Sequence, residues 1–563
     1  MGEKQQSIWS REWSPGVSVR RGLRRCFTWA VFRRVLLGAA VFATVVALIY
    51  VEENLRGKWA WNRYARDVEA RGESLQLPAF LPPPVPDEQN FAMTPFLAPL
   101  FDFEPGTQQW RDTNAPRYAS SMFPRFDSAA ASIASTKAEP INSWVRAPVD
   151  LKAWYHAYRN PANPAASYGE FELRDVGADQ ADQQKVQPVP GVTRETAAAY
   201  VLEAFEEEID PVLDELRMAS RRPHARFNIR YEHEEPFAIL LPHLTVMKRL
   251  FQALNLRVAA SLALGRPDEA HEDILLMFDL LEVSRIEPFL ISHLVCVAEF
   301  NLTLPVILEG LAGQQWNEAQ LREFQARLEN LEFLRDGRRV LEAERVLGIA
   351  TLDRIRLIAD RSELYRSWFN PRPGESPGSF NWVVLPAIVE IAPGGWFHLE
   401  KVNYCKFMDD VLTSIDLESL RVRPGSVRRL ETRIEEELKG SRLGLFLRHR
   451  FFASEMVTSQ NSIRRSAFAH CGRDMTLLAC ALERHRLARG SIPGRLEDLA
   501  PDFVDRIPLD VFTGEPPHYR PTGSGGYVLY SVGWNEKDDG GEPGKEWFSS
   551  KDGDWVWRLA KER

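Results

Sequence analysis

The chain has 563 residues, of which 44% are hydrophobic and 26% are charged, and its formal net charge at pH 7 is -8. This length permits more than one hydrophobic core, and the composition excludes both wholesale disorder and a bundle of membrane spans. The acidic balance argues against nucleic acid as a partner, because phosphate binding requires a basic surface. The five cysteines form no CxxC pair and lack zinc-ligand spacing, which argues against a disulfide scaffold or structural zinc.

The first predicted element is a transmembrane helix at residues 35–51. This run, VLLGAAVFATVVALIYV, carries no charge and covers about 25 Å as a helix, close to the thickness of a hydrocarbon core. Arginines precede it at positions 20, 21, 24, 25, 33 and 34, whereas Glu52 and Glu53 follow it. By the positive-inside rule, residues 1–34 are a cytoplasmic basic segment and the body is translocated; the resemblances given below imply that the membrane is a bacterial inner membrane and the body periplasmic. A cleaved signal peptide, the alternative, would require small residues where Leu48 to Val51 are bulky.

The next two segments connect this span to the body. Residues 52–89 are predicted to form a helical stalk and then a proline-rich linker, LPPPVPDEQN, which favours extended structure. Residues 90–192 are rich in Pro, Ser, Asn and Gly, so we expect an irregular segment packed on the domain that follows.

Residues 193–466 are predicted to form a helical domain. Apolar residues recur every three to four positions, as at Leu250, Leu254, Val258 and Leu262. Gly265 can end that helix and Pro267 can begin the next, while Asn317 and Gln320 can form a capping box. The stretch ASLALGRPDEAHEDIL resembles the loop of a tetratricopeptide unit, so we expect an α-solenoid-like stack that binds protein segments. A plain helical core without a binding groove is the alternative.

Residues 467–563 are predicted to form a small α+β module. A helix ends at Gly490, strands are expected at 518–520 and 527–532 with a glycine-rich hairpin turn between them, and the rest is an acidic, glycine-rich tail. The whole chain is therefore expected to be mainly α.

Two resemblances extend this picture. The order RLARGSIPGRLEDL, IPLDVFTGEPPHYR, YVLYSVGWNEKDDGG is similar to the globular part of type II secretion major pseudopilins. The module, the helical middle and WNRYARDVEARGESL also resemble uncharacterised single-span membrane proteins of the Planctomycetes and Verrucomicrobia kind. The segment CFTWAVFRR lacks the glycine and glutamate of a prepilin-peptidase site, which argues against processing as a pilus subunit.

The pseudopilin resemblance implies a structural calcium ion in the C-terminal loop. The matching stretch contains Asp538, Asp539, Asp552 and Asp554. Calcium prefers carboxylate and carbonyl oxygens, and glycines let a loop turn its carbonyls inward. A solvated acidic tail without metal is the alternative.

Short catalytic motifs fail on inspection. GESPG, at residues 374–378, resembles a nucleophile elbow, but Pro377 has no backbone N–H for an oxyanion. HEEPF at 233 and HEDIL at 271 lack the second histidine of a zinc protease helix, and no nucleotide-binding glycine motif occurs. His485 is expected to be a core or helix-end histidine.

The sequence therefore predicts a membrane-anchored, extracytoplasmic structural or interaction protein linked to secretion or envelope assembly, with no catalysis. Its expected partners are the bilayer, through residues 35–51, and envelope proteins, but no nucleotide. The alternative function is a membrane-tethered hydrolase with a site between the helical domain and the C-terminal module.

Overall fold

The computed structural model describes residues 29–122, 149–159, 191–231, 238–357, 380–439, 442–451, 460–522, 525–544 and 552–559. Helices dominate these residues, and the strands form one two-stranded and one three-stranded sheet, which confirms the prediction of a mainly α protein. The motifs GESPG at 374–378 and HEEPF at 233–237 lie outside the residues just given.

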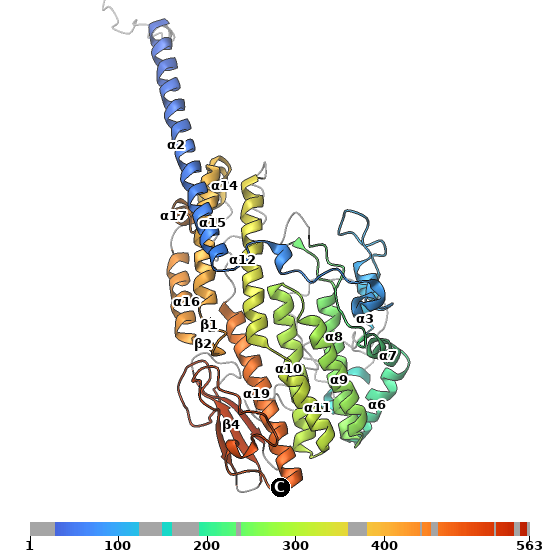
Figure 1. Cartoon of the computed structure of the whole chain (residues 1–563). Helices are drawn as coiled ribbons and strands as arrows, with labels where there is room; N and C mark the ends of the chain where they lie inside the picture. Colours follow the sequence, from blue (N-terminus) through green and yellow to red (C-terminus); the bar gives the residue numbers. More distant parts are fainter. Residues whose placement is uncertain are drawn as a thin grey trace, which may run out of the picture.

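A single long helix, α2 (Trp29–Ala70), leads into the body and stands out from it (Figure 1). The predicted span and the predicted stalk are therefore one unbroken helix. The most apolar window of its Val31–Ala70 portion has a mean hydropathy of 2.3 and is 0% buried, and it is long enough to cross a membrane. Only the C-terminal part of α2 packs on the body, mainly against α15 (Gly394–Leu412).

Short helices follow where the sequence predicts a linker and an irregular segment. They are η1 (Leu77–Ala79), η2 (Asp87–Gln89), η3 (Phe91–Met93), η4 (Ala98–Phe101), α3 (Ala115–Ser121) and α5 (Leu151–Arg159). α3 and α5 pack against α8 (His243–Ala263) in the middle of the chain. These two helices therefore lie against the long helices of the middle of the chain.

The middle of the chain is a layered set of long helices. In order these are α6 (Arg194–Glu206), α7 (Asp210–Ala219), α8, α9 (Pro267–Ser284), α10 (Leu290–Ala312), α11 (Glu318–Glu329) and α12 (Phe333–Leu357). Gly265, at φ +68°, and Pro267 form the turn from α8 to α9. The capping box of Asn317 and Gln320 begins α11. Both of these local predictions are confirmed.

The stack departs from a linear repeat array. α10 packs against α8, α9 and α12 and also against α19 (Gln460–Arg489), a helix from far along the chain. In a solenoid each unit would contact only its neighbours in sequence. α10 is itself apolar and long enough for a membrane span, but 56% of its apolar window is buried in the body.

The segment after α12 completes the end of the body from which α2 emerges. It contains α14 (Phe380–Ile391), α15, the hairpin β1 (Ile415–Asp416) and β2 (Arg421–Val422), α16 (Pro424–Leu438) and α17 (Arg442–Leu447). α15 packs between α12 and α2, and α14 contacts α17.

The C-terminal module contains α19 and an antiparallel sheet in the order β3-β4-β5. Its strands are β3 (His518–Pro521), β4 (Tyr527–Ser531) and β5 (Trp555–Leu559), and the first two match the predicted hairpin. β5 lies in the predicted tail and buries Trp555 and Trp557. The predicted boundary at 466/467 falls inside α19, which packs against α10, α11 and α12.

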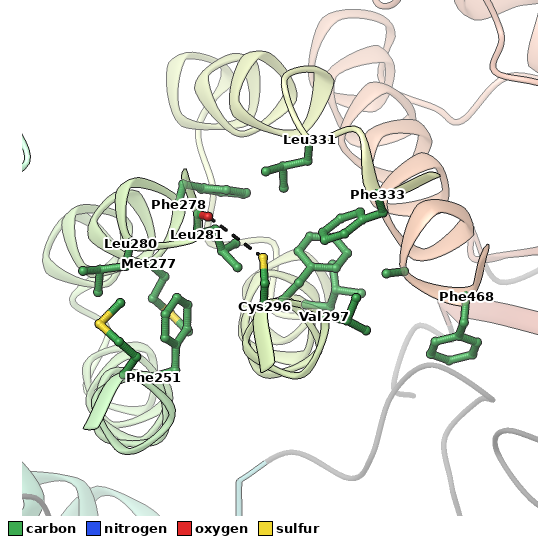
Figure 2. Close-up of a cluster of buried hydrophobic side chains, with 14 of the residues drawn as sticks. Phe251, Met277, Phe278, Leu280, Leu281, Cys296, Val297, Leu331, Phe333 and Phe468 are labelled. Atoms are coloured by element: carbon green, nitrogen blue, oxygen red, sulfur yellow. Dashed lines mark hydrogen bonds between the residues drawn. The ribbon is translucent and has the colours of Figure 1, made fainter. Parts of the chain in front are cut away.

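One hydrophobic core runs from the helical stack into this module. Figure 2 shows Phe251 of α8, Met277 of α9, Cys296 of α10 and Phe468 of α19 in one buried cluster. The ring of Phe468 also meets Trp555 of β5 edge to face, at a centroid distance of 5.0 Å. Cys296, Cys405, Cys471 and Cys480 are all buried and free, as predicted.

Candidate functional site

Two of the predicted calcium residues, Asp539 and Asp554, meet where the segment after β4 contacts the segment that leads into β5. Asp554 is 1% exposed, and its carboxylate accepts backbone N–H groups of Asp539, at 3.0 and 3.1 Å, and of Gly541, at 2.6 Å. Burial raises the pKa of Asp554, although these two N–H donors act in the opposite direction. Gly553, at φ +81°, lets the chain approach Gly544, where a side chain would overlap the backbone.

The other carboxylates of the loop also have partners within the chain. Asp539 accepts hydrogen bonds from Lys537 at 2.7 Å and from Asn535 at 2.9 Å, and these donors lower its pKa. Asp538 accepts from the N–H of Gly540 at 2.8 Å. Within the described ranges, which exclude 545–551, no three His, Cys, Asp or Glu side chains are placed to hold a metal ion.

The carboxylates in the described part of the loop, 538–544 and 552–554, are therefore not arranged as a cation site. The carboxylate of Asp554 points to backbone donors, and an ammonium group already neutralises Asp539. Asp552 lies at the start of the segment that carries Asp554. The loop is closed by its own hydrogen bonds, and calcium stays a prediction from the resemblance.

The candidate histidines have structural surroundings. The Nδ1 of His485 lies 2.7 Å from the carbonyl oxygen of Ser491, and its ring packs on Phe503 at the end of α19. His271 packs on Phe324, and its Nε2 lies 3.4 Å from the carboxylate of Glu323. The helix-end role predicted for His485 agrees with this geometry.

A second candidate site is the joint between α2 and α15, which the sequence did not reveal. At its centre, Gly57 of α2 faces Gly395 in the first turn of α15. A Cβ added to Gly57 would overlap the carbonyl oxygen of Gly395 and would lie 2.6 Å from its carbonyl carbon and 2.7 Å from its Cα. The two backbones touch directly, as in close helix pairs that place small residues at the crossing.

Polar bonds on the N-terminal side of this crossing hold α2 against α15. The side chain of Asn54 accepts the backbone N–H of Gly395 at 2.7 Å and so satisfies a free donor of the first turn of α15. The indole N–H of Trp396 donates to Glu53 at 3.1 Å. The hydroxyl of Tyr50, at the end of the apolar run, donates to the carbonyl oxygen of Ile391.

Beyond the crossing, an ionic network links α2 to α12 and α15. Arg345 is 1% exposed and donates to Glu73 and Asp409, both at 2.7 Å. Tyr64 of α2 donates to the same Asp409 at 2.9 Å, and Arg71 donates to Glu73 at 2.7 Å. Burial alone would raise the pKa of Glu73, but the hydrogen bonds from Arg71 and Arg345 outweigh it and lower that pKa.

A buried lysine adds a further contact between the same three helices. Lys401 of α15 is 2% exposed and donates to Asp353 of α12 at 2.8 and 2.9 Å. Its ammonium also lies 3.9 Å from the centre of the Trp61 ring of α2, a cation–π distance. The joint therefore combines direct backbone packing with paired buried charges.

The helical stack also buries polar groups that resemble parts of catalytic sites. His243 lies 2.7 Å from Glu287, and Ser292 donates to the other oxygen of Glu287 at 2.5 Å. The carboxylate is in the middle, so the histidine cannot accept the serine proton, as a catalytic triad requires. Fully buried Glu299 nearby has a pKa raised to about 8 by burial.

A hollow of about 390 Å³ opens beside α9 and is lined by charged side chains including Arg285 and Arg327. Arg285 is paired with Asp336 at 2.9 Å and Arg327 with Asp279 at 2.8 Å. These guanidinium groups form ion pairs between helices of the stack. The hollow offers no nucleophile beside a base.

Comparison of the chain with protein-family models, curated proteins and solved structures finds no match.

Proposed function

We propose that this chain is a single-span membrane protein whose helical body is held in a fixed orientation to the bilayer. The observation that carries the proposal is that α2 is one continuous helix with an exposed apolar part and a part buried against the body. Its apolar part is exposed, with Val41 at 57% and Val45 at 48%, whereas Gly57 and Tyr64 are buried against the body. A helix this apolar and this exposed requires a nonpolar surrounding, and a bilayer provides one.

The direct crossing at Gly57 and Gly395 supports the rigid part of this proposal. A flexible tether would connect span and body by a polar loop, whereas α2 continues as a helix into the core of the body. The arginines before the apolar run and the glutamates after it support a cytoplasmic N-terminus and an extracytoplasmic body.

The body would then act as a structural or interaction unit of the bacterial envelope. The packing of α19 on the antiparallel sheet β3-β4-β5 supports the pseudopilin-like character of the C-terminal module. A link to a secretion or envelope-assembly system follows from that resemblance.

The anchor is tested with arginines in the middle of the apolar run. The double variant Val41→Arg/Val45→Arg places two charges at the centre of the span, and each costs about 3 kcal/mol on insertion. We expect the wild type to stay in the membrane pellet after alkaline carbonate washing and the variant to be lost from it. Met218→Arg, on an exposed position of the body, is the matched control and should behave as wild type. Release of the wild type by carbonate would contradict the proposal.

The interaction role is tested by cross-linking the tagged full-length chain in its own membranes and identifying the attached proteins by mass spectrometry. Enrichment of secretion or envelope-assembly proteins over a tagged anchor-only control supports this role. Recovery of the same proteins with both baits would remove its support.

A further inference from the structure

Apolar side chains gather on the body at the place where α2 leaves it. Leu357 at the end of α12 and Ile391 at the end of α14 are each 67% exposed, and Leu447 at the end of α17 is 51% exposed. Figure 1 shows these helix ends at the same side of the body, beside α2. Among the described residues of the body, the other exposed large apolar side chains are far apart in the sequence: Tyr118, Met218, Ile291, Leu487 and Leu509.

Contacts at or next to the joint with α2 show how far along α2 each of the three lies. The carbonyl oxygen of Ile391 accepts the hydroxyl of Tyr50, so Ile391 lies level with the end of the apolar run. Arg356, next to Leu357, approaches Gly394, whose other neighbour is the side chain of Asn54.

Leu447 is placed by a third contact with α2. His449, two residues further along the chain, lies 3.4 Å from the guanidinium of Arg56. The three side chains therefore sit between the levels of residues 50 and 56 of α2. At 1.5 Å per residue, this is a layer about 9 Å deep.

This layer has the position and composition of a bilayer interface. The apolar run of α2 ends within it, and headgroup regions extend about 5 to 8 Å beyond the hydrocarbon core. Glu52 and Glu53 directly follow the run: Glu52 is exposed, as a headgroup layer allows, and Glu53 is paired with Arg56 at 2.6 Å and bonded to Trp396. Exposed Lys58 and Arg448 flank the layer and can meet lipid phosphates.

We propose that the membrane-proximal end of the body, formed by Leu357, Ile391 and Leu447, is seated in the headgroup layer of the bilayer that α2 crosses. This proposal rests on the proposed anchor. It adds a second contact with the membrane, which prevents the body from tilting about α2. The occupant is lipid because the surface is continuous with the lipid-facing part of α2.

The test places an environment-sensitive fluorophore on single cysteines of the full-length protein in lipid nanodiscs. Ile391→Cys and Leu447→Cys probe the layer, and substitution at such exposed positions preserves the core. Val45→Cys in the apolar run and Leu509→Cys on the body are the two reference positions. Cys26 is replaced by Ser, and the four remaining native cysteines are buried.

Quenching by lipids that carry a spin label at a shallow or a deep acyl position reports the depth of each fluorophore. We expect shallow-lipid quenching at 391 and 447 to be at least threefold that at 509, with weaker quenching by the deep label. The Val45→Cys probe should be quenched most by the deep label.

Two results would overturn the proposal and are distinguishable. Quenching at 391 and 447 equal to that at 509, with strong quenching at 45, refutes the seated end and leaves the anchor standing. Absence of quenching at 45 refutes the anchor itself and, with it, the seated end.

Discussion

Replacement of Gly57 by alanine tests whether the joint depends on direct contact between two backbones. The added Cβ would lie 2.7 Å from the Cα of Gly395, whereas carbon atoms in contact prefer about 3.5 to 4.0 Å. The obstacle is main chain, so no side-chain rotation can relieve the overlap. The helices must separate by about 1 Å, which also strains the bond from Asn54 to Gly395.

Two opposing effects determine the magnitude. Alanine is favoured over glycine inside a helix by about 1 kcal/mol. Overpacking of a tight contact costs about 1 to 3 kcal/mol, and a backbone obstacle places Gly57→Ala at the upper end. The net loss of about 1 to 2 kcal/mol raises the population of the undocked joint about 5- to 30-fold.

Pulsed electron paramagnetic resonance on the full-length protein in nanodiscs measures this population. Spin labels on Asn62→Cys of α2 and Lys406→Cys of α15, both exposed positions, report the distance across the joint in a Cys26→Ser background. Gly38→Ala is the matched control, because Gly38 lies in the same helix and a Cβ there meets nothing within 4 Å.

We expect Gly57→Ala to broaden the distance distribution and shift it to longer values, and Gly38→Ala to leave it unchanged. An unchanged distribution with Gly57→Ala would refute direct backbone packing at the crossing. Equal broadening by both variants would show that the effect belongs to α2 as a whole.

Three further predictions concern buried charges. A pKa of Glu299 raised from 4.5 to about 8 means that the folded state binds more protons than the unfolded state between these values. The free energy of unfolding of the wild type therefore falls as pH rises through this window. In denaturant titrations, the stability of Glu299→Gln relative to wild type should rise by a few kcal/mol between about pH 5 and pH 8. The control Glu206→Gln, at an exposed position, should show no such rise. Arg345→Met should cost about 3 to 5 kcal/mol because it removes the buried guanidinium shared by Glu73 and Asp409, which keep only Arg71 and Tyr64 as donors. Arg322→Met, at a 70% exposed ion pair, should cost under about 1 kcal/mol in the same titrations. Asp554→Asn should lower the melting temperature equally in calcium and in chelator, because the carboxylate binds backbone N–H groups; a loss seen only in calcium would instead support a calcium site.

Local chemistry allowed several elements to be predicted from the sequence. The turn at Gly265 and Pro267, the capping box at Asn317 and the helix end at Gly490 each depend on residues within a few positions of one another. The strand predicted at residues 527–532 likewise matches β4. Such signals need no knowledge of distant contacts.

Features that depend on contacts between residues far apart in the chain could not be predicted from the sequence. Gly57 is one of 34 glycines, and nothing near it indicates that Gly395 will lie against it. β5 follows an acidic, glycine-rich stretch, so only its pairing with β4 reveals that Trp555 begins a buried strand. The spacing of Asp538, Asp539 and Asp554 is compatible with calcium, but only the folded structure shows that backbone and lysine donors hold all three carboxylates.

The most direct test of the account is the sidedness of the two ends of α2. Wild-type Cys26 reports the N-terminal side, and Met218→Cys in a Cys26→Ser background reports the body, while the other native cysteines are buried. Both proteins are treated in spheroplasts with a membrane-impermeant maleimide. The account predicts labelling of Met218→Cys in intact spheroplasts and labelling of Cys26 only after permeabilisation. Labelling of both, or of Cys26 alone, before permeabilisation would contradict it.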